Sequence, residues 1–393
     1  MLIVGIDIAK RSHEACFINE SGAILGKTFS FPNSHAGVDL LLTQIRKRNP
    51  DSQPVVFGME ATGHYWLALY SRLVQEGFMV HVINPIQSDS LRNFYIRQTK
   101  TDQVDAFLVA EVIRFGRFSQ TCLAEPNLIA LRQLCRYRFF LVDQIADVKR
   151  KVIGLLDQVF PEYESLFSNL FGTSSRQMLA DFSSPEEFLA VDTEKLALLL
   201  RQTSHGHFGM HQAQRIQDAA RHSFGVKLGS DALIFELRQL IAQIDFLESQ
   251  LTELGEQISH LYDQFDCTLH TIPGVGKVLA AVIFSEIGDI HRFAAPEKLV
   301  AFTGMDPSLK QSGEFTGTHS HMSKRGSSYL RRAIWLAAFP ASKFNPILAA
   351  FYQKKRSEGK AHGTALGAVS RKLIYTIFAL LKSGQSYDPN LAR

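Results

Sequence analysis

Two aspartates, Asp102 and Asp105, stand three residues apart in the segment TKTDQVDA. If this segment opens a helix, the spacing places both carboxylates on one face, where they repel each other unless a positive charge lies near them. Each has a simpler interpretation: Asp102 could cap the helix and interact with its dipole, and Asp105 could be a solvated surface charge. A shared metal ion is the interpretation with chemical consequences.

Two further carboxylates lie near the ends of predicted buried strands. The apolar run LIVGIDIA carries Asp7, and the run PVVFGMEA carries Glu60. If the two strands are neighbours in one sheet, these carboxylates meet at the same edge, and a helix packed there would add Asp102 and Asp105. Four carboxylates in one place cannot all stay ionised without counter-charge. The pattern therefore predicts Mg²⁺, a pair of ions that would clamp the attacking and leaving oxygens of a phosphoryl transfer.

A candidate nucleophile lies in the polar, basic loop DPSLKQSGEFTGTHSHMSKRG. Ser312, which a glycine follows, would need a base and cations around a phosphate, and His319 and His321 are candidate proton carriers. Residue types alone do not choose Ser312 over its neighbours, which are Ser308, Ser323, Ser327 and Ser328. The candidate phosphate-binding cations are Lys310, Lys324, Arg325, Arg331 and Arg332, together with Lys100 beside the aspartates.

The segment IPGVGKVLAA predicts a tight turn that opens a helix. Gly274 and Gly276 would let backbone amides and a helix N-terminus approach a phosphate, with Lys277 alongside. The turn resembles a helix-hairpin-helix DNA-binding turn. No strand precedes it and the third glycine is absent, which argues against a dinucleotide-binding loop. The alternative is a purely structural connection between two helices.

Charge is distributed unevenly along the chain. Residues 310–393 hold 14 lysines and arginines against three acids, a formal charge of +11, whereas the whole chain carries only +4. A basic C-terminal module on an otherwise acidic chain favours a polyanionic partner, most naturally nucleic acid. The alternative is a basic but merely solvated surface.

The elements that must position these residues can be read from hydrophobic periodicity. Residues 1–120 predict an α/β region with buried strands at LIVGIDIA, PVVFGMEA and MVHVINP. The helix from about Asp102 to Arg117 should bury one apolar face, formed by Val104, Phe107, Leu108 and Val112. Beyond Cys267 the pattern becomes mainly helical.

Two long helices are predicted in the middle of the chain. The first covers residues 127–160, and shorter helices follow at 165–230. The second carries apolar residues in strict four-three alternation, which favours a coiled coil over a bundle core helix. Its partner could be the first helix or a second subunit. The alternating positions are Leu233, Leu237, Leu240, Ile244, Leu247, Leu251, Leu254, Ile258 and Leu261.

Composition argues against several classes of protein. The four cysteines lie far apart and form no CxxC pair, so neither a zinc site nor a disulfide framework is expected. The N-terminus reads as a strand and not as a signal peptide, and no segment reaches 18 apolar residues. We therefore expect a cytoplasmic protein, in the bacterial cytosol and associated with the nucleoid when active, with no membrane partner.

The motifs together resemble the DEDD-type transposases of bacterial insertion sequences, the bridge-RNA-guided recombinases related to Piv-type DNA invertases. GIDIAK, MEATGHYW, INP and RQTKTDQVDA are similar to that family's N-terminal RuvC-like (RNase H-like) domain. IPGVGKVLAAVIFSEIGDIHRFAAPEKLVAFTGMDP, the SG pair and SKRGSSYLRRAIWLAA are similar to its C-terminal transposase domain. The implied domains are 1–125, coiled-coil helices at 126–265 with an insertion at about 165–230, and 266–393.

The resemblance implies a mechanism. Its four acids fall on Asp7, Glu60, Asp102 and Asp105, which would bind Mg²⁺, and its nucleophile falls on Ser312, with Ser323 as the less favoured match. It implies a phosphoserine intermediate and strand exchange between donor and target DNA. A structured noncoding RNA would pair with both duplexes, and dimers would assemble into a tetramer with composite sites.

Two other functions stay open from sequence. A RuvC-like Mg²⁺-dependent nuclease or junction resolvase would use the acids to hydrolyse DNA without any serine-linked intermediate. A scaffold that only binds RNA or DNA would need neither the acids nor Ser312. Set against the family that it resembles, the chain is expected to be longer than a minimal member, with residues 165–230 as the additional or variable part.

Overall fold

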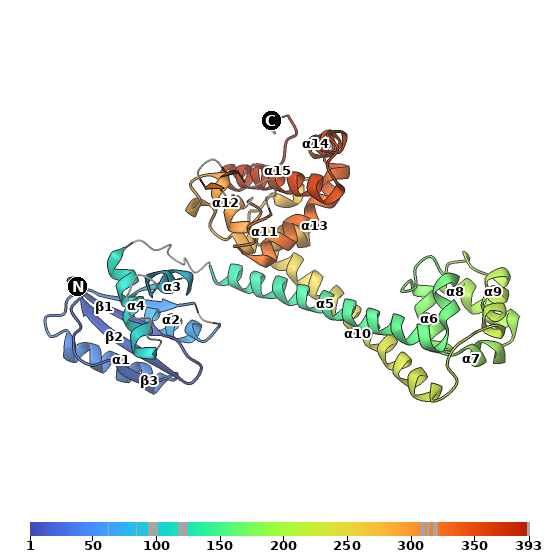
Figure 1. Ribbon diagram of the computed structural model, residues 1–393, viewed down its shortest axis with the longest axis horizontal. Helices are drawn as coiled ribbons and strands as arrows, with labels where there is room; N and C mark the ends of the chain where they lie inside the picture. The colour runs from blue at the N-terminus through green and yellow to red at the C-terminus, as the bar shows by residue number, and fades with distance from the viewer. Residues whose placement is uncertain are drawn as a thin grey trace. The chain divides into compact units, whose positions relative to one another are not determined.

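In the computed structural model the chain divides into two compact units, Met1–Leu123 and Ala124–Arg393 (Figure 1). The described residues are 1–61, 63–83, 85–92, 101–116, 125–306, 311–312, 315–316 and 321–390. Of these, the structure describes only the backbone at 86, 87, 90, 92, 311, 312, 315 and 316.

The first unit is built on a five-stranded sheet with the order β3-β2-β1-β4-β5. Strand β1 pairs antiparallel with β2 and parallel with β4, β2 pairs antiparallel with β3, and β4 pairs parallel with β5. The strands are β1 Leu2–Asp7, β2 Ser12–Asn19, β3 Phe29–Pro32, β4 Val55–Glu60 and β5 Met79–Ile83. This confirms the predicted mixed α/β region.

Helices cover both faces of this sheet. Along β1, Val4 and Ile6 pack with residues of α1 (His35–Arg48) and α2 (Trp66–Gln75), whereas Ile3 packs with α4 (Asp102–Phe115) on the other face. The short helix α3, Pro85–Arg92, lies beside α4. Because side chains alternate along a strand, one strand contributes to two cores.

Helix α4 lies unusually close to the sheet at two glycines. A Cβ atom on Gly5 of β1 would lie 2.2 Å from the carbonyl oxygen of Ala106 and 2.4 Å from the amide nitrogen of Ala110. A Cβ atom on Gly58 of β4 would lie 2.4 Å from Ile113 Cγ1. Any larger residue at Gly5 would push the helix away, so this glycine sets the height of α4 above β1.

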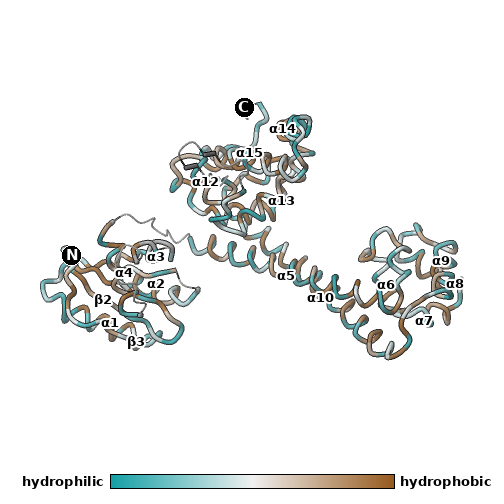
Figure 2. The backbone as a smooth tube through the Cα atoms, in the orientation of Figure 1, coloured by the Kyte–Doolittle hydropathy of each residue, from teal (hydrophilic) through white to brown (hydrophobic). Residues whose placement is uncertain are grey.

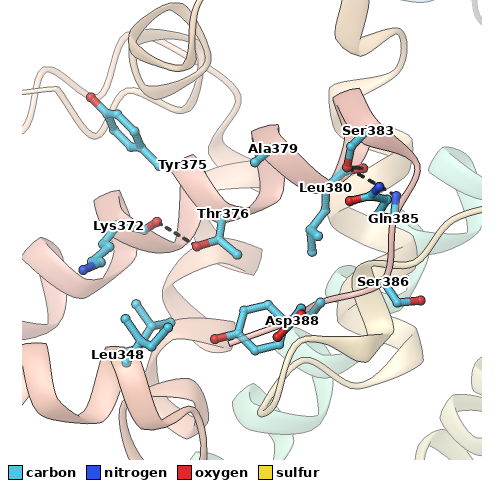
Figure 3. A pocket seen from close by; sticks show the side chains of 12 residues that line it. Leu348, Lys372, Tyr375, Thr376, Ala379, Leu380, Ser383, Gln385, Ser386 and Asp388 are labelled. Carbon is cyan, nitrogen blue, oxygen red and sulfur yellow. Dashed lines mark hydrogen bonds between the residues drawn. The ribbon is translucent and has the colours of Figure 1, made fainter. Parts of the chain in front are cut away.

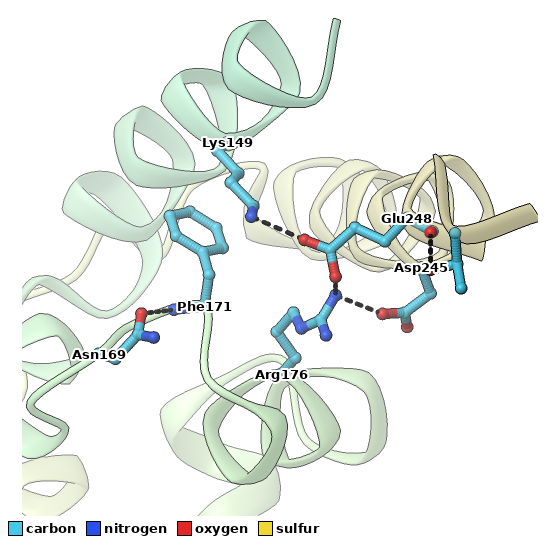
Figure 4. Close-up of polar contacts among 7 residues, drawn as sticks. Lys149, Asn169, Phe171, Arg176, Asp245 and Glu248 are labelled. Atoms are coloured by element: carbon cyan, nitrogen blue, oxygen red, sulfur yellow. Dashed lines mark hydrogen bonds and ion pairs between the residues drawn. The ribbon is translucent and has the colours of Figure 1, made fainter. Parts of the chain in front are cut away.

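The second unit contains two long helices, α5 (Pro126–Val159) and α10 (Ser230–Tyr262), which pack along each other in antiparallel directions. All nine positions of the predicted apolar seam in α10 are buried or half-buried. Figure 2 shows hydrophobic and hydrophilic residues alternating along both helices. At their flank, Lys149 Nζ lies 2.8 Å from Glu248 Oε1, and Arg176 binds Glu248 Oε2 and Asp245 at 2.6 and 2.8 Å (Figure 4).

A helical module lies between α5 and α10 in the chain. It has its own apolar core, in which Tyr163 and Phe188 are completely buried, and this core continues onto the adjoining parts of α5 and α10. The module closes on itself, since the Val226 amide donates to the Gln158 carbonyl oxygen at 2.7 Å. Its elements are η1 Pro161–Leu166, α6 Thr173–Asp181, α7 Pro185–Ala190, α8 Thr193–Thr203 and α9 Met210–Arg221.

The remaining helices form a second core with the other parts of α5 and α10. Helix α15 is long and apolar enough to cross a membrane by length and composition alone, but Val369, Leu373 and Ile377 pack in this core, which accounts for its apolar character. The elements are η2 Leu269–Thr271, α11 Lys277–Ile287, η3 Ile290–Arg292, α12 Pro296–Thr303, β6 Gln311–Ser312, β7 Phe315–Thr316, α13 Ser328–Phe344, α14 Pro346–Ser357 and α15 His362–Ser383. The prediction of a mainly helical C-terminal region is confirmed.

Candidate functional site

Asp7 and Glu60 lie side by side at one edge of the sheet. Strands β1 and β4 are parallel, with Ile6 opposite Met59, so the next residue of each strand is the carboxylate. Both carboxylates are half-buried. The hydroxyl of the buried Ser88 in α3 lies within hydrogen-bonding distance of Glu60 Oε1, at 3.1 Å.

The first turn of α4 brings the other two aspartates to the same edge. Asp105 directly precedes Ala106, whose carbonyl oxygen lies against Gly5, and Asp7 follows Gly5 by two residues on the same face of β1. Asp105 is half-buried and Asp102 is exposed. The residue that caps α4 is Thr101, whose hydroxyl accepts from the Val104 amide at 3.3 Å. The interpretation of Asp102 as the cap is therefore wrong.

The four carboxylates interact electrostatically. Burial, and after it the negative charges of Asp105, Asp102 and Glu60 in that order, together raise the pKa of Asp7 to about 6. Within the residues that the structure describes, no three His, Cys, Asp or Glu side chains lie close enough together to hold a metal ion. The donors are all carboxylate oxygens, which fit a hard cation such as Mg²⁺. A cation would relieve the repulsion that holds the pKa of Asp7 high.

One residue near Asp7 was missed by the sequence reasoning. His13 is buried on β2, its Nδ1 accepts from the Ala9 amide at 3.3 Å, and burial lowers its pKa. A neutral imidazole there fixes the turn that follows Asp7. Its signal in the sequence was a single histidine between Ser12 and Glu14, which does not distinguish a structural role from any other.

Ser312 lies on a two-stranded hairpin in the second unit. Its backbone pairs with Phe315, in the antiparallel ladder of β6 and β7. The acids therefore belong to one compact unit and Ser312 to the other. Among the predicted site residues, Lys100 and Lys310 lie outside the described part of the chain, as do Ser308 and His319.

A ladder of hydrogen bonds joins the two chain segments that flank this hairpin. The amides of Ser323, Lys324 and Ser327 donate to the carbonyl oxygens of Asp306, Gly304 and Phe302 at 2.9, 3.0 and 3.1 Å. The Ser323 hydroxyl also donates to the Asp306 carboxylate. Ser323, the alternative nucleophile, is thus engaged at the base of the hairpin. We call these three backbone bonds and the Ser323–Asp306 bond the hairpin ladder.

The predicted phosphate-binding cations fall into two groups. Lys324 and Arg325 are exposed, and Lys324 adopts a left-handed backbone conformation with φ of 55°. Arg331 donates to the Thr303 carbonyl oxygen at 3.1 Å, and Arg332 forms a two-pronged ion pair with Asp143 of α5 at 2.6 and 2.8 Å. Lys324 and Arg325 are therefore available to an external phosphate, whereas Arg331 and Arg332 make contacts within the protein.

The glycine-rich turn has a clear packing role. Gly274 has a φ of 93°, and a Cβ there would lie 2.5 Å from the amide nitrogen of Ala341 in α13. Gly276 precedes α11 and faces open space, and Lys277 Nζ lies 2.8 Å from the Asp263 carboxylate. Gly274 thus supports the structural alternative, while Gly276 leaves the start of α11 accessible.

A cavity of about 340 Å³ opens between α14, α15 and the chain end (Figure 3). Its lining includes Leu348, Lys372, Tyr375 and Tyr387. None of the predicted site residues contributes to that lining.

Comparisons with known proteins match both the segment that holds the four acids and the segment that holds Ser312. A family model for DEDD-type IS110 proteins, described as "Transposase", matches residues 4–161, and one described as "Transposase IS116/IS110/IS902 family" matches residues 267–353. The first range contains the four acids and the second contains Ser312.

Relatives extend the match along the whole chain. An uncharacterized 43.6 kDa protein of insertion element IS110 from Streptomyces coelicolor is 24% identical over 401 residues, covering 99% of this chain and 96% of its own. The pilin gene-inverting protein of Moraxella bovis is 24% identical over 392 residues, covering 99% and 98%. The transposase for insertion sequence element IS1111A from Coxiella burnetii is 30% identical over 126 residues, covering 31% and 34%.

Proposed function

This chain belongs to the IS116/IS110/IS902 family of transposases, and from that premise we propose that it cuts and rejoins donor and target DNA with Ser312 as nucleophile. The single observation that supports a catalytic centre most directly is the raised pKa of Asp7, caused by burial together with three other carboxylates. Carboxylates gathered against their mutual repulsion indicate a site for chemistry. The pilin gene-inverting relative, named for the inversion of DNA, agrees with recombination.

The sheet supports a RuvC-like (RNase H-like) assignment for the first unit. Its order is β3-β2-β1-β4-β5, the first three strands form an antiparallel meander, and β4 and β5 run parallel to β1. The acids fall at the carboxyl ends of β1 and β4, with the first turn of α4 beside them. This arrangement is the one expected of a nuclease-type sheet in which carboxylates hold metal ions.

The proposed metal ligands are Asp7, Glu60, Asp102 and Asp105. Two Mg²⁺ ions bound there would neutralise and orient the scissile phosphate. The protein itself supplies the carboxylates from rigid elements: two from neighbouring strands, and two from a helix whose height is set by Gly5. Asp7, with its pKa of about 6, must lose its proton before it can act as a ligand.

In the proposed reaction the Ser312 hydroxyl loses its proton to a base, and its oxygen attacks a backbone phosphorus. The bond from phosphorus to the leaving strand breaks, so a phosphoserine link forms and the leaving strand ends in a hydroxyl. Strand exchange follows when the hydroxyl of another strand attacks the phosphoserine, which restores the serine. Lys324 and Arg325, exposed beside the hairpin ladder, neutralise phosphate charge.

The proposed partners are double-stranded donor and target DNA and a structured noncoding guide RNA that pairs with both. Dimers that assemble into a tetramer would bring the acids of one subunit to the Ser312 of another. The guide RNA and the oligomer rest on the family alone. Sequencing of RNA that copurifies with the protein tests the first, because a guide must contain segments complementary to both the element's ends and its target.

The second candidate function is a RuvC-like nuclease or junction resolvase that needs only the acids. It is favoured by one observation, that the acids and Ser312 belong to different compact units. The decisive experiment incubates the protein and its copurified RNA with end-labelled DNA, and traps protein–DNA adducts by denaturation. We expect adducts with wild type and with Ser323→Ala, and none with Ser312→Ala or in EDTA.

Strand cleavage that persists in Ser312→Ala and leaves free ends would establish the nuclease instead. Adducts that survive in Ser312→Ala but not in Ser323→Ala would move the nucleophile to Ser323. Adducts formed undiminished in EDTA would contradict the role of the four carboxylates.

A further inference from the structure

A buried carboxylate in the second unit has no part in the proposed reaction. Glu286 lies on α11 and is 4% exposed. Its two oxygens accept from Arg136 of α5, with Nε to Oε1 at 2.6 Å and Nη2 to Oε2 at 3.1 Å. Oε2 also accepts from the Ser327 hydroxyl at 2.9 Å. One carboxylate thus joins Arg136, 150 positions before it in the chain, to Ser327, 41 positions after it.

Ser327 is the residue through which this carboxylate reaches the hairpin. Its hydroxyl also accepts from the Leu330 amide at 3.2 Å, so it caps α13. Its own amide donates to the Phe302 carbonyl oxygen, which is one bond of the hairpin ladder. Ser327 therefore belongs both to the Glu286 contact and to the segment that leads from the hairpin of Ser312 into α13.

Further contacts hold the first turns of α13 on α5. The Arg136 guanidinium lies over the ring of Tyr329, 4.8 Å from its centroid, and that ring stacks on Phe139 at 6.0 Å. The bond to Glu286 raises the pKa of Arg136 above its already high usual value, so the arginine stays charged. The exposed Arg332–Asp143 pair joins the same two helices.

Charge and burial make Glu286 the centre of this junction. A buried carboxylate is stable only when it is paired and hydrogen-bonded, and both conditions are met here by Arg136 and Ser327. Replacing it by a neutral amide of the same shape keeps the packing but removes the two-pronged ion pair. The loss would therefore act on the orientation of Ser327 more than on the volume of the core.

We propose that Glu286 is a positioning residue for strand cleavage: through Ser327 it fixes the base of the Ser312 hairpin on α5. The inference rests on the proposed function, in which Ser312 is the nucleophile. Glu286 itself does not touch the reacting phosphate. It determines where the hairpin ladder sits on α5.

The test compares Glu286→Gln with a matched control, Glu248→Gln. Glu248 also binds two cations, but these are Lys149 of α5 and Arg176 of α6, on the flank of the helix pair (Figure 4). In single-turnover reactions at saturating DNA we expect Glu286→Gln to slow adduct formation at least about tenfold while the DNA dissociation constant stays within about twofold. Glu248→Gln should leave both values within about twofold of wild type.

The second arm uses Ser327, which also serves if Glu286→Gln does not fold. Ser327→Ala should reproduce the slow adduct formation. Ser327→Thr should instead form adducts at the wild-type rate, because threonine can also cap a helix and donate to Glu286. Ser327→Ala combined with Glu286→Gln should be no slower than the slower single variant. Additive losses, or equal losses in Glu286→Gln and Glu248→Gln, would overturn the proposal.

Hydrogen exchange separates this inference from the proposed function. If wild type forms no Ser312-dependent adduct, the proposed function fails, yet the positioning can still be measured. Amides at 323–327 should exchange faster in Glu286→Gln than in wild type or Glu248→Gln. Unchanged exchange at these amides would overturn the positioning role, whatever the nucleophile.

Discussion

The two units position their candidate site residues by different physical means. In the first, strand register and a helix lying on glycines place four carboxylates at one sheet edge. In the second, Ser312 belongs to a small hairpin whose flanking segments are held by hydrogen bonds and one buried ion pair. The first arrangement depends on steric contact and the second on polar contact, so they should fail differently when single residues change.

The two units also differ in the charge around their candidate site residues. At the sheet edge, burial together with the negative charges of the neighbouring carboxylates raises the pKa of Asp7 to about 6. The hairpin region has exposed Lys324 and Arg325, and residues 310–393 carry a formal charge of +11. Negative charge at the sheet edge favours a cation there, whereas exposed positive charge beside the hairpin favours an anion.

The largest effect is expected for Gly5→Ala, which tests the steric side. The new Cβ would lie 2.2 Å from the Ala106 carbonyl oxygen, so α4 and its two aspartates must move away from β1. Because a displacement of about 1 Å can cost on the order of 100-fold in rate, we expect DNA cleavage to fall by at least that much. Gel assays of cleavage measure it.

The control is Gly255→Ala in α10, where nothing lies within 4 Å of the new atom. It should keep full activity and raise the unfolding free energy by about 0.5–1 kcal/mol. Cleavage by Gly5→Ala within about twofold of wild type would show that the height of α4 does not matter.

The next largest effect is expected for Gly326→Ala, which tests the polar contacts that hold the hairpin of Ser312. A Cβ there would lie 1.8 Å from the Phe302 carbonyl oxygen, which accepts from the Ser327 amide. Losing one or two bonds of the hairpin ladder costs about 0.5–1.5 kcal/mol each, so we expect adduct formation to slow about tenfold. Thermal unfolding of the first unit should not change.

Gly363→Ala, near the start of α15 with nothing within 4 Å, is the control for this variant and should behave as wild type. If Gly326→Ala instead destabilises the first unit as much as Gly5→Ala does, the two units do not behave independently.

A smaller effect is expected on DNA affinity. Lys324→Ala and Arg325→Ala should each weaken binding a few-fold and reduce the slope of log affinity against log salt by about 1, since each removes one phosphate contact. Fluorescence anisotropy at several salt concentrations measures both. Lys195→Ala, an exposed lysine of the helical module, should leave the slope as it is. If the slope is unchanged in both Lys324→Ala and Arg325→Ala, these two residues do not belong to the DNA-binding surface.

The smallest effect is expected for Asp7→Asn, on the unfolding free energy and its dependence on pH. The folded pKa of Asp7, about 6, exceeds the ordinary 3.8, so its carboxylate destabilises the metal-free protein above pH 6 and has no effect below about pH 4. After discounting for partial exposure, Asp7→Asn should raise the unfolding free energy at pH 7.5 by about 1 kcal/mol, and the gain should vanish by pH 4. Urea unfolding in EDTA measures it.

Asp51→Asn, at an exposed loop position, serves as the control and should change nothing at either pH. A lower stability of Asp7→Asn at pH 7.5 would mean that the carboxylates do not repel one another in the folded protein.

The sequence was sufficient to predict the elements that carry the acids. Asp7 and Glu60 follow continuous apolar runs, which are typical of buried parallel strands. The buried face of α4 was predicted less well: Val104 and Phe107 are only half-buried, whereas Ala106 and Ala110 are fully buried. Periodicity describes one helix, but which side packs deepest depends on the glycines of the strands beneath it.

The polar contacts of the second unit could not be predicted. Arg136 and Glu286 lie 150 positions apart, and Arg332 and Asp143 lie 189 apart, so no local pattern connects them. Arg332 was predicted to bind phosphate, but its guanidinium forms an ion pair with Asp143. Long-range ion pairs depend on tertiary packing, which one sequence does not display.

The closed base of the helical module has a consequence for engineering. Val226 binds Gln158, and a Cβ on Gly225 would lie 2.1 Å from the Val159 carbonyl oxygen, so the chain leaves α5 and returns to α10 at adjoining points. A segment with adjacent ends can be exchanged for a short loop or a foreign domain without rerouting the rest of the chain. Residues 160–229 are thus a site at which a new binding domain could be inserted into a recombinase. Replacing them by a short loop would shorten the protein.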